Sequence, residues 1–384
     1  MFRRIGGVIL WAVAIFMLSS VTVFNPGQVT DWFVKIFNIK PSVPELKPVV
    51  ITERDLQIRA VVEGISEESL KETVEALSGL GSRVPGYPGH RKAFEYVKNR
   101  FEEIGLENIR VEEHFVTVPV DKGATLTISE TGEEVELFGL WPNHVRTPSL
   151  PKGGVLGTVI YGGDGSFKAL NGKPVKGSIV LMDFDCGQNY LNPRMLGAQA
   201  IIFFDNGKVT QGQAMEKFLQ VPVDVPRFWV EDKNLVQLMA LTKSSTKEVG
   251  ITARMDWEEV PTWNVYGSIP GESTFVTERE ERKWEDETVL LSSFYDAISV
   301  VPGLAPGAEN ATGMAALLET AKALKQNRPK YSVMVMANGA HFQGLAGVND
   351  FLFRHSRESE HFQELMTEDQ KIDFRLFVGF DLSS

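Results

Sequence analysis

Continuous apolar runs separated by a helical pattern constrain the last third of the chain more than any other feature. Strands that are apolar at nearly every position are typical of parallel sheets buried on both faces by helices. The sequence therefore predicts an α/β fold with a mostly parallel sheet sandwiched by helices. The runs are NVYGSIPG, TVLLSSFYDA, YSVMVMANG and FRLFVGFDL, and the helical pattern covers residues 312–325.

Chemistry in such sheets lies at the carboxyl ends of the strands. Polar side chains follow these strand ends, and two of the ends also have a phenylalanine. In chain order the residues are Phe294, Asp296, Glu309, His341, Phe342 and Asp381.

Composition excludes several classes of protein. Of 384 residues, 43% are hydrophobic and 23% charged, which excludes a disordered chain. The net charge of -11 disfavours nucleic-acid binding, because that affinity comes from basic clusters. A single cysteine, Cys186, excludes an intramolecular disulfide and a cysteine-based zinc site.

An uncharged run of twenty residues, 5–24, follows Arg3 and Arg4 and is long enough to cross a bilayer. The positive-inside bias predicts a signal-anchor at residues 5–25, a cytoplasmic tail at 1–4 and a single-pass membrane protein whose bulk is extracytoplasmic. Residues 26–56 are rich in proline and predict a partly extended stalk. The alternative is a cleaved signal peptide, whose apolar region is ordinarily only about 7 to 15 residues.

The rest of the chain divides by pattern. Helices are expected after a Ser66 cap, ending at Gly79, and over 93–104, ending at Gly105. Residues 119–262 form short β-rich runs, with buried strands at 178–182 and 201–204. An Asp/Cys group and two histidines in these regions could be either metal ligands or structural residues. We favour a polar turn over a metal site for Asp183, Asp185 and Cys186, and surface or packing roles for His90 and His114.

Several segments resemble, in order, the co-catalytic di-zinc peptidases that include bacterial aminopeptidases, glutamate carboxypeptidase and the transferrin receptor. They are GSRVPGYPG, AFEYVKNRFEEIGL, NVYGSIPG, TVLLSSFYDA, PGAENATGMAALLETAKAL and GAHFQGLAGV. The resemblance implies a zinc-exopeptidase-like domain formed by 57–118 plus 263–384. Residues 119–262 are similar to the protease-associated domain that these proteins carry as an insertion.

Members of this family bind two zinc ions through five ligands and use a carboxylate as general base. The resemblance places Glu309 and Asp381 at ligand positions, Asp296 behind the first ligand, and His341 at the general-base position. Phe294 and Phe342 stand where two further ligands would be, and phenylalanine has no lone pair to donate. The last ligand, a histidine, would lie beyond Ser384, so the peptidase-like domain is expected to be C-terminally incomplete.

Two residual ligands predict absent or weak zinc binding. We therefore expect a non-catalytic homologue that acts in binding or scaffolding, with a peptide or protein ligand and a homodimer as candidate partners. A zinc-dependent aminopeptidase or carboxypeptidase with a rebuilt site is the alternative, and a truncated piece of such an enzyme is the third interpretation. The spacings of His341, His355 and His361 place them on no common helix face and disfavour a rebuilt site.

Overall fold

The computed structural model describes residues 52–144, 146–218, 224–244, 247–272, 275–276, 281–282, 288–355, 372 and 374–383. The predicted membrane segment and most of the predicted stalk lie outside them. Among the described residues, no helix combines the length and the apolar composition needed to cross a bilayer. The chain divides into two compact units, Met1–Leu56 and Gln57–Ser384, and the second contains the large sheet.

The helices are α3 (Glu53–Glu63), α4 (Glu67–Ser78), α5 (Pro88–Ile104), α6 (Phe167–Leu170), α7 (Leu191–Met195), α8 (Gln211–Met215), α9 (Asp232–Leu241), the 3-10 turn η2 (Glu309–Ala311), α10 (Thr312–Gln326) and α11 (Ala346–His355). The strands are β1 (Glu107–Ile128), β2 (Glu134–Gly139), β3 (Val155–Tyr161), β4 (Ile179–Asp183), β5 (Ala200–Phe204), β6 (Arg227–Trp229), β7 (Glu248–Ile269), β8 (Phe275–Val276), β9 (Glu281–Arg282), β10 (Thr288–Phe294), β11 (Ser332–Asn338) and β12 (Phe374–Phe380).

Local signals place the first helices. The Ser66 hydroxyl accepts a hydrogen bond from the Ser69 amide at 3.2 Å, and α4 ends at Gly79 as predicted. Helix α5 ends at Gly105, whose φ of 78° lies in the left-handed region that glycine adopts without strain.

The end of the predicted stalk is helical, not extended. Helix α3 begins at Glu53, inside the range 26–56 expected to be a stalk. The Thr52 amide donates to Asp55 Oδ2 at 2.7 Å, and the Asp55 amide donates to Thr52 Oγ1 at 3.2 Å. This reciprocal capping satisfies amides at the start of the helix, which explains why helix begins here.

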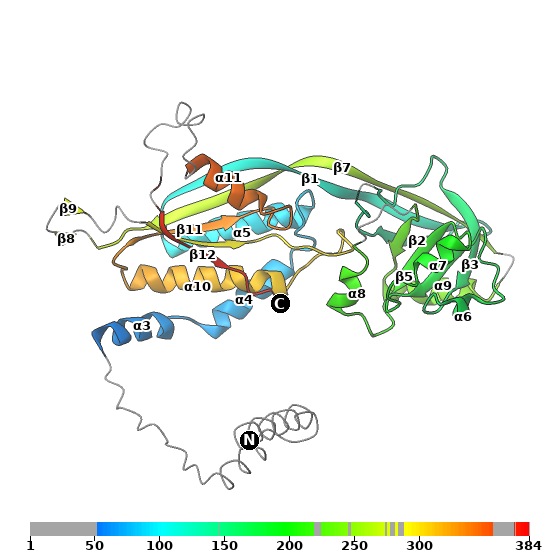
Figure 1. Ribbon diagram of the computed structural model, residues 1–384, viewed down its shortest axis with the longest axis horizontal. Helices are drawn as coiled ribbons and strands as arrows, with labels where there is room; N and C mark the ends of the chain where they lie inside the picture. The colour runs from blue at the N-terminus through cyan, green and yellow to red at the C-terminus, as the bar shows by residue number, and fades with distance from the viewer. Residues whose placement is uncertain are drawn as a thin grey trace, which may run out of the picture. The chain divides into compact units, whose positions relative to one another are not determined.

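Ten strands form one sheet in the order β1-β2-β6-β5-β4-β3-β7-β11-β10-β12. The expectation of a mostly parallel sheet is corrected to a mixed one. Strand β10 is parallel to β11 and β12, whereas β7 is antiparallel to β11 and to β1. The reason is that β1 carries the chain out to the middle segment and β7 brings it back beside β1, as Figure 1 shows.

The middle segment, residues 119–262, has its own core. Strands β3, β4, β5 and β6 are parallel neighbours, and β4 and β5 confirm the two buried strands expected there. Leu126, Ile179, Ile202 and Phe228 are all fully buried in this core. The predicted boundaries at 118/119 and 262/263 fall inside β1 and β7, so the two strands extend from one core into the other.

Helices cover both faces of the sheet near β10 and β11. Leu77 of α4, Phe101 of α5 and Leu317 of α10 pack in one fully buried cluster with Val335 of β11. Phe351 of α11 packs on the other face, in a separate cluster. Full burial of each such side chain contributes about 1.5 to 3 kcal/mol, so helices on both faces contribute to holding the strand ends in place.

Candidate functional site

Strands β10, β11 and β12 end at the same edge of the sheet. Their parallel register pairs Phe294 with Asn338 and Ser293 with Phe380. The loops that leave these strands therefore begin close together, as expected for the edge where α/β sheets carry their chemistry.

The two acidic positions that the resemblance assigns to metal ligands are both exposed. Glu309 opens the turn η2, and the Thr312 hydroxyl donates to its carbonyl oxygen at 2.7 Å. Helix α10 then passes so close to the end of β12 that a Cβ on Gly313 would lie 2.5 Å from the Phe380 carbonyl oxygen. Asp381 follows that strand directly, so η2 and Asp381 border the same edge.

Phe294, His341 and Phe342 pack together at this edge and are called the aromatic cluster below. The rings of Phe294 and His341 are stacked, with centroids 3.9 Å apart and an angle of 21° between their planes. Phe342 meets both rings edge-on, with centroids at 5.3 and 5.0 Å. Phe294 is only 2% exposed, so its ring has become part of the packed interior.

Asp296 holds the turn that presents His341. It is completely buried, and its Oδ2 accepts a hydrogen bond from the His341 amide at 2.9 Å. Burial raises the pKa of Asp296 to about 7, although the amides of His341 and Phe342 and the charge of Arg83 partly offset this rise. The preceding Ala340 has a φ of 58°, a conformation uncommon outside glycine, which the carboxylate helps to fix.

Arg83 fixes the loops around the site, a role that the sequence alone did not suggest. Its side chain is fully buried, and Nε donates to the Tyr295 carbonyl at 2.9 Å. Nη2 donates to the Gly307 carbonyl at 3.0 Å, and Nη1 donates to that of Pro306. One guanidinium therefore joins the end of β10 to the loop before Glu309.

His341 approaches one of the two acidic positions. Its Nε2 lies 3.9 Å from Asp381 Oδ2, which is too long for a hydrogen bond. Partial burial lowers the pKa of His341, and the charge of Asp381 offsets part of that shift. The pair is therefore an electrostatic contact at the sheet edge.

The donor set at this edge does not fit two zinc ions. Each ion needs about four N, O or S donors. Within the described part of the chain, no group of three or more His, Cys, Asp or Glu side chains is placed to hold a metal ion. The resemblance assigns two ligands to the positions of Phe294 and Phe342 and the general base to that of His341, whose ring is stacked on Phe294, and the two acids are exposed.

Two further histidines that the structure describes have contacts of their own. His90 packs on Tyr295, with ring centroids 5.0 Å apart, and its Nε2 bonds the Thr262 hydroxyl, which confirms its packing role. His355 Nε2 lies 2.8 Å from Glu112 Oε1 on the α11 face of the sheet. His361 lies outside the described residues.

Asp183 Oδ1 accepts a hydrogen bond from the Tyr161 hydroxyl at 2.8 Å. This contact gives the carboxylate a structural partner at the end of β4 and agrees with the polar-turn interpretation.

Comparison with known proteins finds a model of Peptidase family M28 that matches residues 264–381, which is less than half of the chain. The matched range contains the aromatic cluster, Asp296 and both exposed acids. No curated protein matches the chain.

Solved structures of peptidases resemble the chain at low identity. A zinc aminopeptidase from Bacillus subtilis is 18% identical with a TM-score of 0.49, over 82% of this chain and 69% of that one. The aminopeptidase from Aneurinibacillus sp. strain AM-1 is 19% identical with a TM-score of 0.39, over 81% and 69%. A peptidase M28 precursor from Shewanella amazonensis SB2B is 15% identical with a TM-score of 0.47, over 83% and 72%.

Proposed function

We propose that this chain is a membrane-anchored protein with a peptidase-like fold that does not hydrolyse peptide bonds and acts by binding a peptide or protein. The observation that carries the proposal is the aromatic cluster. Phe294 and Phe342 stand at positions that the resemblance assigns to metal ligands, and their rings pack against His341 instead.

The chemistry of metal-assisted hydrolysis explains why this packing matters. A metal peptidase needs a fixed ion with an open position for water, and a base beside it. Here the buried ring of Phe294 covers one face of His341, and Asp296 is engaged by the His341 amide. Aromatic packing has replaced the polar environment that a hydrolytic water would require.

The cellular setting belongs to the same proposal. The apolar run at 5–24, preceded by Arg3 and Arg4, supports a single-pass anchor with the bulk of the chain outside the cytoplasm. The β-rich segment 119–262 is proposed to be a protease-associated insertion, and a homodimer is a further candidate assembly. Zinc is expected to bind weakly or not at all.

A second candidate is a metal-dependent aminopeptidase or carboxypeptidase with a rebuilt site. The observation that favours it is the 3.9 Å approach of His341 Nε2 to Asp381 Oδ2, since small movements could turn both groups toward one ion.

Metal content distinguishes the two candidates. The full-length protein should purify with well under one equivalent of zinc, measured by atomic absorption after dialysis, and EDTA should not change its melting temperature. It should also release no product from aminoacyl or acyl-peptide substrates with zinc or cobalt added. Stoichiometric zinc that survives dialysis, together with metal-dependent hydrolysis, would contradict the proposal and support the rebuilt site.

A further inference from the structure

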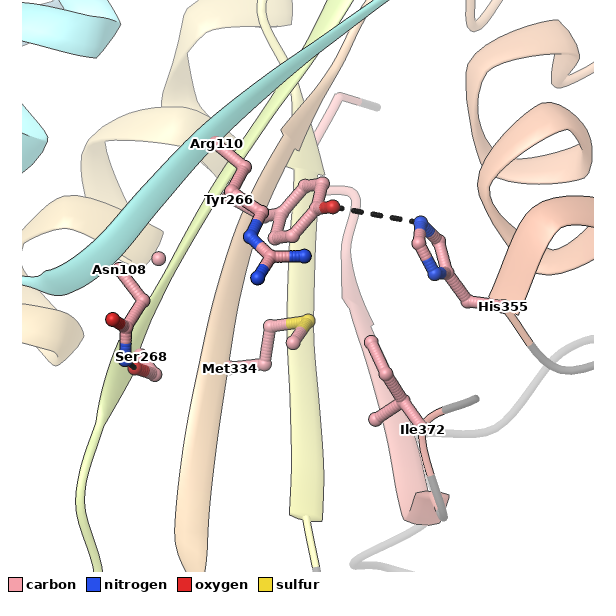
Figure 2. A pocket seen from close by; sticks show the side chains of 8 residues that line it. Asn108, Arg110, Tyr266, Ser268, Met334, His355 and Ile372 are labelled. Carbon is pink, nitrogen blue, oxygen red and sulfur yellow. Dashed lines mark hydrogen bonds between the residues drawn. The ribbon is translucent and has the colours of Figure 1, made fainter. Parts of the chain in front are cut away.

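A cavity of about 210 Å³ opens where α11 ends against the sheet, shown in Figure 2. We call it the α11 cavity. It is lined by side chains from β1, β7, β11 and α11 and by Ile372, two residues before β12, and the lining includes Arg110, Tyr266, Ser268, Met334 and His355.

The α11 cavity is separate from the aromatic cluster. Ser268 pairs with Met334, near the beginning of β11, whereas the aromatic cluster follows the end of the same strand at Asn338. Strand β11 rises by about 3.3 Å per residue, so the two sites lie toward opposite ends of it. Ligand binding here does not depend on the proposed loss of peptidase activity.

One wall of the cavity is a polar network around Glu112 Oε1. The Tyr266 hydroxyl donates to Glu112 Oε1 at 2.9 Å, and His355 Nε2 lies 2.8 Å from the same oxygen. Tyr266 and His355 are 4% and 5% exposed. Desolvation alone would raise the pKa of Glu112, but the contacts with His355 and Tyr266 hold it below its ordinary value. Oε1 of Glu112 is thus engaged by these two side chains, and Glu112 is not among the residues that line the cavity.

Arg110 is an exposed charged residue that lines the cavity. Figure 2 shows its guanidinium in the hollow between Tyr266 and Met334. Among the residues that the structure describes, no carboxylate forms an ion pair with it, in contrast to Arg354, which binds Asp350 at 2.9 Å. A guanidinium presents parallel N–H donors that match the two oxygens of a carboxylate.

The floor below Arg110 is apolar. Met334 and Ile372 are half-buried there, and the Tyr266 ring forms the side. An apolar floor under one guanidinium complements a molecule with one negative end and a small apolar body. A multiply charged ligand fits less well, because the chain carries a net charge of -11 and Arg110 is the one Arg or Lys among the described residues that line this hollow.

We propose that the α11 cavity binds a small apolar monocarboxylate, with Arg110 binding the carboxylate and Met334 and Ile372 contacting the apolar body. The polar network of Glu112, Tyr266 and His355 fixes the wall against which the ligand packs. The volume of the cavity limits the ligand to a compact molecule, such as one with a single ring or a short branched chain.

Benzoate and its uncharged isostere benzamide test this assignment on the full-length protein carrying ¹³C-methyl methionine. Benzoate should shift the methyl resonance of Met334 in a saturable titration and leave that of Met314 unchanged, because Met314 of α10 is buried in the core on the other face of the sheet. Benzamide should bind at least tenfold more weakly. Arg110→Gln should weaken benzoate binding at least tenfold, and Arg110→Lys by a smaller factor.

Arg59→Gln is the matched control, since it removes the same charge from an exposed arginine on α3. It should leave the benzoate titration unchanged. Equal binding of benzamide and benzoate would overturn the carboxylate assignment, as would an equal loss in Arg59→Gln and Arg110→Gln. Failure of benzoate to move the Met334 resonance at any concentration would overturn the site itself.

Discussion

The buried carboxylate of Asp296 lacks the histidine partner that the resemblance predicts for it. The resemblance predicts an imidazole at position 294, and a phenyl ring stands there instead. The carboxylate binds the His341 amide through Oδ2, while Oδ1 has no hydrogen-bond partner among the described residues. An unsatisfied buried oxygen costs free energy. A polar side chain at position 294 would therefore be stabilised by a hydrogen bond to Asp296 Oδ1.

Restoring the imidazole tests this directly. Phe294→His should cost about 2 kcal/mol in the free energy of unfolding, because a polar ring replaces a buried phenyl. It should also increase zinc or cobalt affinity, since Asp381 and Glu309 border the same edge and Asp296 can orient the new ring. Isothermal titration measures the metal affinity, and urea unfolding measures the loss of stability.

Phe294→Leu is the control, because it removes the aromatic ring without adding a donor. If folded Phe294→His takes up no more metal than Phe294→Leu, the assignment of position 294 as a former ligand is wrong. If Phe294→His does take up more metal, the further changes Glu309→Asp, His341→Glu and Phe342→Glu should raise the metal affinity again. Metal binding should return before hydrolysis does.

His90 predicts a specific dependence of stability on pH. Burial lowers the pKa of His90 from 6.5 to about 3, so the unfolded chain binds a proton that the folded chain does not between those values. The contribution of neutral His90 to the free energy of unfolding is fully present above pH 6.5. It is lost progressively as the pH falls toward 3, by up to about 1.4 kcal/mol per pH unit. Urea unfolding at pH 7 and pH 5 should show a smaller difference for His90→Gln than for the parent. The same substitution at the exposed His144 should not reduce it.

At the scale of elements, α4 and α10 are joined through one buried carboxylate. Glu319 of α10 is 1% exposed and accepts from the Ser66 amide at 3.0 Å and from the Ser69 hydroxyl at 2.6 Å. A carboxylate at a helix N-terminus satisfies amides that have no partner within the helix and is favoured by the helix dipole. The start of α4 is thus fixed by tertiary structure as well as by its own cap.

Removing the charge of Glu319 should destabilise the contact between α4 and α10. Glu319→Gln should lower the free energy of unfolding by about 1 to 2 kcal/mol, and Ser66→Ala by about 1 kcal/mol. Glu75→Gln on the exposed side of α4 is the control and should stay within about 0.5 kcal/mol of the parent. Equal effects of Glu319→Gln and Glu75→Gln in chemical denaturation would show that the buried contact contributes nothing.

At the scale of the molecule, β1 and β7 connect the two cores of the unit Gln57–Ser384. They pair from Glu107 and Ser268 to Ile128 and Val249, which gives the middle segment two continuous strands as its connection. Relative motion between the cores must therefore bend a paired ribbon and not a single-stranded linker.

The predicted anchor at residues 5–25 would attach the whole protein to a membrane. The full-length protein should remain in the membrane pellet after a carbonate wash, with residues beyond about 45 cleaved by protease added only from outside. A charge in the middle of the apolar run, Val13→Arg, should release part of the protein, because arginine at a span centre costs about 2.5 to 3.5 kcal/mol. A mature soluble form that begins near residue 25 would establish a cleaved signal instead.

Several local features of this protein can be predicted from the amino-acid sequence alone. The side-chain cap of Ser66, the glycine cap at Gly105, the buried strands of the middle segment and helix α10 follow from short-range patterns, because capping and apolar periodicity are properties of neighbouring residues. The phenyl rings at positions 294 and 342 are likewise evident from the sequence. Long-range packing decides that β7 returns beside β1 to make the sheet mixed, that the ring of His341 stacks on Phe294, and that Arg83 and Arg110 hold the positions they do. These arrangements depend on contacts between residues far apart in the chain, whose register and packing no local pattern encodes.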